Sequence, residues 1–238
     1  MFDILKSLLI SFVVVAVLLP VVRYALRRMS PAGNVPALSP DEVAYAQKQD
    51  RKLTFFYYIF ACILAVICTG GLALLSSIIH MSREHLYVLT PNFRAMFAPG
   101  LLLGLTLATL PLRAAQKSLL GQEYDLYKTY MRQQEGANSV RAYYVLLVIM
   151  LVLSCVAAWF ALRWHVVVSA KELTITNLLQ QESTYRLEAI KEIRYLGKEG
   201  EYLISFTDQT SINTAYLKPV NLEMIALLAE RSGTRVIR

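Results

Sequence analysis

The residues best suited to metal chemistry lie in one short polar segment between two apolar stretches. Residues 80–94 contain His80, Glu84 and His85, and imidazole and carboxylate groups are common zinc ligands. Their spacing does not match a zinc signature such as H-E-x-x-H, in which both histidines lie on one helix face. A polar loop at a membrane surface explains the same residues. These three residues are therefore candidate ligands, and no metal or cofactor is predicted.

The rest of the sequence offers little for catalysis. His165 follows Trp164 at the end of an apolar stretch, where an interfacial position is expected. The sequence contains no glycine-rich phosphate loop, cysteine pair or nucleophile elbow. The apolar stretches contain no Asp or Glu, on which proton-coupled transporters and intramembrane proteases commonly rely. We therefore predict that the protein is not an enzyme.

The composition is that of a membrane protein. Hydrophobic residues make up 56% of the 238 residues and charged residues 17%, against about 25% charged residues in an average protein. The net charge of +7 is concentrated in the polar segments that flank the apolar stretches, where basic residues set membrane topology. The charge therefore predicts contact with a lipid bilayer and no binding of nucleic acid.

Four apolar stretches are long enough to cross the ~30 Å hydrocarbon core of a bilayer as helices. They cover residues 4–22, 53–79, 95–112 and 142–162. The first is interpreted as an uncleaved anchor and not as a signal peptide, because its start lacks a net positive charge. The fold class predicted for residues 1–162 is therefore a membrane all-α domain with four transmembrane helices.

The third stretch contains small residues at four-residue intervals, namely Gly100, Gly104 and Ala108. This spacing puts them on one helix face, so that a second helix can approach closely, as in small-xxx-small motifs. The motif predicts packing within the bundle or between two chains, and the sequence does not choose between them. The partner predicted for the transmembrane helices is accordingly another protein or a second copy of this chain.

Two helices are predicted in the longer polar segments. Ser39 and Glu42 form a capping box, and the helix that they start runs into the second apolar stretch. Residues 122–134 form another helix, with Tyr124, Tyr127 and Tyr130 along one side. These tyrosines are predicted to lie against the membrane interface or the helix after Ser39, or to contact a partner protein.

From Trp164 onward the pattern changes to short β-strands. Alternating and apolar runs predict strands at residues 164–169, 171–179, 183–187, 190–196, 201–206 and 210–214. Pro219 starts an amphipathic helix that runs to Arg231, and Gly233 is its C-cap. Antiparallel strands closed by one C-terminal helix are typical of a small α+β domain, which is predicted to cover residues 163–238.

The segments LTITN…STYRLEAIKEIRY and YLISFTDQTSINT, with the helix after them, resemble bacterial pleckstrin-homology-like (PH-like) domains, which are often joined to membrane helices. The resemblance implies a PH-like domain and a bacterial inner-membrane protein. Lipid-binding members usually present a basic cluster in an early loop, whereas here Lys171 is opposed by Glu172. A packing or protein-interaction role is therefore favoured over specific inositide binding.

Basic residues also predict the sidedness of the chain. Residues 23–52 carry six Lys and Arg and residues 113–141 carry five, whereas residues 81–94 carry two. The positive-inside rule places the two richer segments in the cytoplasm and leaves the C-terminal domain outside. The PH-like resemblance points to a cytoplasmic domain instead. We follow the charge asymmetry, because it acts directly on membrane insertion.

These observations predict a multi-pass membrane protein without catalytic activity, which acts as a scaffold, sensor or regulator through protein or membrane-surface contacts. Two alternatives stay open. A small transporter or channel subunit would need polar groups between the helices, and the candidates are Thr69, Ser76, Thr106, Thr109 and Ser154. A membrane enzyme acting on lipid or envelope material would need an activity that depends on His80, Glu84 or His85.

Overall fold

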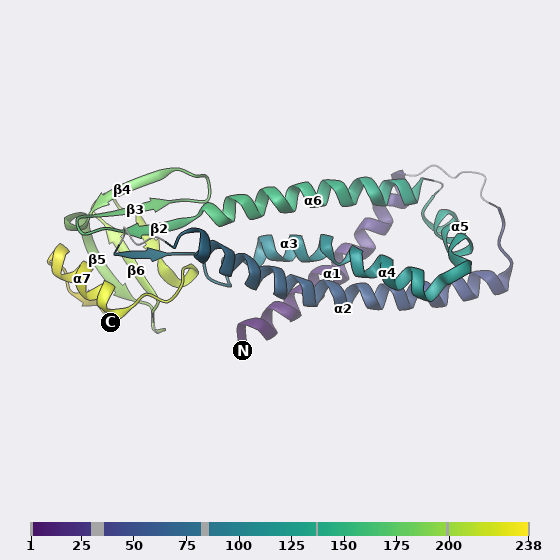
Figure 1. Ribbon diagram of the computed structural model, residues 1–238, viewed down its shortest axis with the longest axis horizontal. Helices are drawn as coiled ribbons and strands as arrows, with labels where there is room; N and C mark the ends of the chain where they lie inside the picture. The colour runs from purple at the N-terminus through teal and green to yellow at the C-terminus, as the bar shows by residue number, and fades with distance from the viewer. Residues whose placement is uncertain (1, 30–35, 82–85, 137, 199, 238) are drawn as a thin grey trace. The chain divides into compact units, whose positions relative to one another are not determined.

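The computed structural model describes residues 2–29, 36–81, 86–136, 138–198 and 200–237 (Figure 1). Four of its helices are long and apolar enough to cross a membrane, as the sequence predicts for a multi-pass membrane protein. The chain folds into two compact units. The helical unit comprises Met1–Cys68 and Gly100–Val156, and the sheet unit comprises Thr69–Pro99 and Ala157–Arg238.

The helical unit is built mainly from helices in six segments, which Figure 1 labels. They are α1 (Phe2–Met29), most of α2 (Pro40–Ile79), most of α3 (Phe97–Leu107), α4 (Thr109–Leu120), α5 (Tyr124–Glu135) and most of α6 (Ser139–Arg163), with the 3-10 turn η1 (Gly121–Glu123) before α5. The predicted capping box at the start of α2 is confirmed. The Glu42 backbone N–H donates to Ser39 Oγ at 3.3 Å, and the Ser39 N–H donates to Glu42 Oε2 at 2.8 Å.

In the third apolar segment α3 ends and α4 begins on either side of Ala108, whose backbone keeps a helical conformation with φ −59° and ψ −22°. Hydrogen bonds run through the break, from Ala108 N–H to the Gly104 carbonyl at 2.9 Å and from Leu112 N–H to the Ala108 carbonyl at 3.3 Å. Pro111 has no N–H to donate to the carbonyl of Leu107, so one helical hydrogen bond is missing there. The proline thus separates α3 from α4.

The sheet unit contains two four-stranded sheets, in the orders β1–β2–β3–β4 and β7–β6–β5–β8. The strands are β1 (Tyr87–Leu89), β2 (His165–Val168), β3 (Glu172–Thr176), β4 (Glu182–Arg186), β5 (Ile190–Tyr195), β6 (Tyr202–Phe206), β7 (Ser211–Asn213) and β8 (Val236–Ile237). The 3-10 turns η2 (Leu187–Ala189) and η3 (Thr214–Tyr216) precede β5 and follow β7, and α7 (Leu222–Ser232) precedes β8.

One apolar core holds the sheet unit together. Val166 and Val168 of β2, Ile193 of β5 and Phe206 of β6 are buried in it. Helix α7 adds Met224, Ile225 and Leu228, which lie at helical spacing on its inner face. Gly233 ends α7 with a φ of 68°, a left-handed conformation that glycine adopts without steric cost, so the predicted C-cap is confirmed.

Four features of the sheet unit differ from the expectation. The last helix begins at Leu222, after Asn221, and not at Pro219. The strand predicted at 171–179 ends at Thr176, because the Asn177 side chain accepts hydrogen bonds from the N–H groups of Leu179 and Gln181 and turns the chain. Strand β1 comes from the segment between the second and third apolar stretches, where only a polar loop was expected. Strand β8 follows α7 and pairs in parallel with β5, whereas only antiparallel strands were expected.

Candidate functional site

A partly buried group of ions joins three helices of the helical unit. Arg23 of α1 contacts Asp50 of α2, with 3.1 Å between Nη2 and Oδ1. Its Nε lies 3.6 Å from Oε1 of Glu135 in α5. The Glu135 side chain is only 3% exposed, although carboxylates are rarely buried without a partner. The packing of α5 therefore depends on a charge carried by α1.

Hydroxyl groups complete this arrangement. The Tyr127 hydroxyl donates to Asp50 Oδ1 at 2.9 Å, and the Tyr143 hydroxyl donates to Glu135 Oε1 at 3.1 Å. Tyr143 lies on α6, so the network reaches a fourth helix. We call Arg23, Asp50, Tyr127, Glu135 and Tyr143 the ion cluster.

The ion cluster lies where the apolar stretches end. Arg23 follows the first stretch directly, Asp50 stands just before the second, and Tyr143 begins the fourth. Desolvation of three ions is costly, and their mutual attraction offsets that cost only in good geometry. The cluster therefore fastens α5 to the ends of three apolar helices.

The predicted tyrosine stripe divides between two environments. Tyr127 and Tyr130 are buried in a core with Ala46 and Leu53 of α2, the helix that starts after Ser39. Tyr124 is 42% exposed. Of the three tyrosines, Tyr124 alone leaves a large part of its ring for lipid or a partner.

The predicted small-residue face packs inside the helical unit. A Cβ atom built on Gly104 would lie 2.5 Å from the Cα of Ala65, so α3 and α2 are nearly in backbone contact there. Ala108 is fully buried together with Val15 of α1 and Ala61 of α2. Gly100 is buried as well. The small side chains permit this close approach, as in other membrane helix pairs.

Of the three candidate metal ligands, only His80 belongs to the part of the chain that the structure describes. Glu84 and His85 lie outside the described residues. The rings of His80 and His165 are in contact, with centroids 4.1 Å apart and planes tilted by 32°, and the Nδ1 atom of each ring lies 2.8 Å from a backbone carbonyl oxygen. Among the described residues, no group of three or more His, Cys, Asp or Glu side chains could hold a metal ion.

In the sheet unit, the segment after β1 is bound to the chain near η3. The Asn92 side chain donates to the carbonyl oxygens of Ala215 at 2.7 Å and Leu217 at 2.9 Å. Its Oδ1 accepts from the N–H of Arg94 at 3.0 Å, and the Arg94 side chain forms an ion pair with Glu201 at 3.3 Å. This segment is thus an integral part of the sheet unit.

We expect Asn92→Ala to lower the free energy of unfolding of the sheet unit by about 2 kcal/mol, since it leaves two partly buried carbonyl oxygens and two N–H groups without partners. Asn221→Ala is the matched control. Within the described chain the Asn221 side chain makes no capping hydrogen bond, and it is exposed. Thermal unfolding of both purified variants in detergent measures the difference. Equal stability of the two variants would show that Asn92 is not a structural link.

The turn between β3 and β4 exposes two large apolar side chains. Leu178 is 50% exposed and Leu179 is 73% exposed. Gln180, the next residue, accepts a hydrogen bond at 3.1 Å from Arg163 at the end of α6. The Arg163 guanidinium in turn lies 4.4 Å from the ring centroid of Trp159. Tryptophan and arginine at a helix end are typical of a membrane–water interface. We call Leu178, Leu179 and Gln180 the leucine turn.

Comparison with protein-family models, with curated proteins and with solved structures finds no match to this chain. The assignment of a role therefore depends on the geometry of the chain itself.

The sequence pattern did not predict the ion cluster or the hydrogen bonds that Asn92 makes near η3. Arg23 directly follows an apolar stretch, where a basic residue is expected to set membrane topology. Its partners Asp50 and Glu135 lie 27 and 112 positions further along the chain. Asn92 follows the run YVLTP, whose three-residue strand is too short to show a clear alternation. Pro91, which precedes Asn92, is a turn signal, but it does not indicate which residues the Asn92 side chain contacts.

Proposed function

We propose that this chain is a multi-pass membrane protein without catalytic activity, which acts as a scaffold, sensor or regulator by holding its sheet unit at the bilayer surface. The leucine turn supports this proposal most directly. Burial of an exposed leucine is worth about 1.5–3 kcal/mol, so Leu178 and Leu179 together favour contact between this turn and the interface. The hydrogen bond from Arg163 to Gln180 holds the turn near the end of α6.

We further propose that the sheet unit is a PH-like domain on the outer side of the membrane. Two small sheets and a packed helix α7 support the PH-like assignment, while β1 and β8 are additions to that pattern. The pairing of β1 with β2 requires residues 87–89 and 165–168 to share one side. The charge asymmetry of residues 23–52 and 113–141 favours the outside for both.

Single cysteines in the full-length protein test both parts of the proposal. In a background without Cys62, Cys68 and Cys155, we expect a fluorophore at position 179 to be quenched by lipids that carry a nitroxide near the headgroup. The same fluorophore at Ser211, an exposed position in β7, should be quenched much less. In intact cells, an impermeant thiol reagent should label position 211 and spare position 139.

Equal quenching at positions 179 and 211 would reject the membrane-surface contact. Labelling at position 139 and not at 211 would place the sheet unit in the cytoplasm. A transporter is the second candidate, because the ion cluster places the buried Glu135 and the partly buried Asp50 next to the ends of the apolar stretches. A solute flux into vesicles that Asp50→Asn abolishes would favour it over the scaffold.

A further inference from the structure

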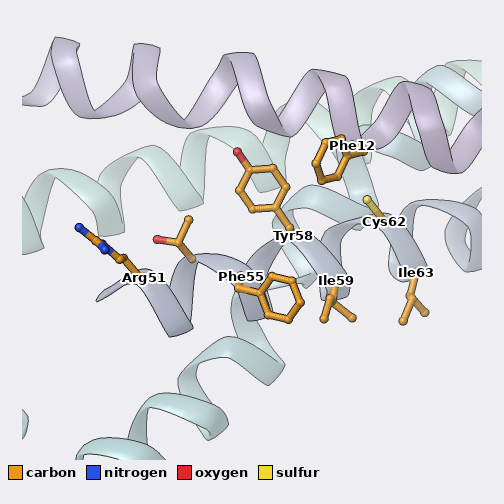
Figure 2. Close-up of a pocket in the computed structure, with 8 residues that line it drawn as sticks. Phe12, Arg51, Phe55, Tyr58, Ile59, Cys62 and Ile63 are labelled. Atoms are coloured by element: carbon orange, nitrogen blue, oxygen red, sulfur yellow. The ribbon is translucent and has the colours of Figure 1, made fainter. Parts of the chain in front are cut away.

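A shallow groove of about 590 Å³ lies along the outside of α2 in the helical unit. Figure 2 shows Phe12 of α1 near Tyr58 and Cys62 of α2, and the Phe12 and Tyr58 ring centroids are 5.3 Å apart. The remaining lining residues all come from α2: Arg51, Thr54, Phe55, Ile59 and Ile63. The groove is therefore apolar over most of its length and carries one charged side chain.

The order of these residues gives the groove a direction. Arg51, Phe55, Tyr58, Cys62 and Ile63 recur at helical intervals, so they share one face of α2. At 1.5 Å per residue, the distance from Arg51 to Ile63 along the axis is about 18 Å. This is comparable to the length of one extended lipid acyl chain. Arg51 stands just before the second apolar stretch, where lipid headgroups are expected.

Arg51 and Arg23 differ in their ion-pair partners. Arg23 is paired with Asp50 and Glu135, whereas no ion pair joins Arg51 to another described residue. Lys52 is exposed next to it, and residues 23–52 carry a net positive charge. A negatively charged group is therefore favoured at this end of the groove, and the guanidinium can hold phosphate oxygens with paired N–H groups.

From these features we propose that the groove binds one anionic phospholipid, with the headgroup phosphate on Arg51 and an acyl chain along Phe55, Tyr58 and Ile63. The site lies in the helical unit and is independent of the function proposed for the sheet unit. Hydrocarbon surrounds this face in a membrane, so an acyl chain is the natural occupant. The Arg51 guanidinium, which forms no ion pair with the described residues, adds the preference for an anionic over a zwitterionic headgroup.

Native mass spectrometry of the full-length protein in detergent tests the site with two probes of equal chain length, dioleoyl phosphatidylglycerol and dioleoyl phosphatidylcholine. We expect the wild-type chain to retain phosphatidylglycerol with about tenfold higher affinity. Arg51→Gln should remove most of this preference, and Arg51→Lys should keep part of it. Lys52→Gln, which removes an equal charge outside the groove lining, should leave the preference nearly unchanged.

Alkylation of Cys62 supplies a second measurement that leaves Arg51 intact. In a chain without Cys68 and Cys155, phosphatidylglycerol should slow the reaction of Cys62 with a maleimide more than phosphatidylcholine does. Equal protection by the two lipids would overturn the proposal. So would an equal loss of preference in the variants at positions 51 and 52, because the charge effect would then be general rather than local.

Discussion

Replacement of Arg23 with methionine is expected to lower the free energy of unfolding by about 3 kcal/mol, since it removes the cation that contacts both the partly exposed Asp50 and the buried Glu135. The repulsion between the two carboxylates would then no longer be offset by this guanidinium. Chemical or thermal unfolding in detergent measures the change. Arg28→Met, which removes an exposed charge from the same helix, is the control and should have little effect.

A variant in which all three charged residues of the ion cluster are neutral distinguishes the effect of charge on stability from the effect of side-chain packing. In the triple variant Arg23→Met, Asp50→Asn, Glu135→Gln, the buried charges are gone while the side-chain volumes are nearly kept. We expect much of the lost stability to return, because buried ion pairs replaced by neutral groups of similar size are often neutral in stability. A triple variant as unstable as Arg23→Met would mean that Arg23 acts through its packing and not through its charge.

Gly104→Ala is expected to destabilise the helical unit by about 1–3 kcal/mol, the usual cost of forcing an extra carbon into a packed core. The new methyl group would lie 2.5 Å from the Ala65 Cα, and a backbone atom cannot move aside as a flexible side chain does. Helices α2 and α3 would have to separate locally. The measurement is the unfolding transition of the purified variant in detergent.

Gly71→Ala is the matched control for this substitution. Gly71 also lies in an apolar helix, and no described atom lies within 4 Å of its added Cβ. Alanine has the higher helix propensity, so the control should be neutral or slightly more stable than the wild type. Similar stabilities for the Gly104 and Gly71 variants would contradict the close contact at Ala65.

Much of the architecture follows from local sequence patterns. The four apolar helices, the capping box at Ser39 and the C-cap at Gly233 are each determined by residues within one or two turns of the chain. The interval of the small residues at Gly100, Gly104 and Ala108 predicts a face for close helix contact, and Gly104 lies close to the backbone of Ala65. The interval could not tell whether the contact lies within one chain or between two, because that depends on distant residues.

The parts that sequence patterns did not predict depend on contacts between distant segments. The ion cluster includes a contact between Arg23 and Glu135 of α5, and the periodicity of apolar residues does not predict a contact between such distant positions. The sequence left open whether Tyr127 and Tyr130 lie at the membrane interface or against the helix after Ser39, and in the structure they pack against that helix, where the Tyr127 hydroxyl donates to Asp50. Leu178 and Leu179 continue a strand pattern, and the Asn177 side chain ends that strand before them.

The pairing of β1 with β2 has a consequence for the order of events during biosynthesis. Residues 87–89 leave the ribosome before the third and fourth apolar helices, and their strand partner leaves after both. The first sheet therefore cannot close until the last helix has been inserted, and β1 must wait without a partner while some 75 residues are translated. A segment that begins at residue 163 would leave the edge of β2 uncovered and would be prone to pair with other chains.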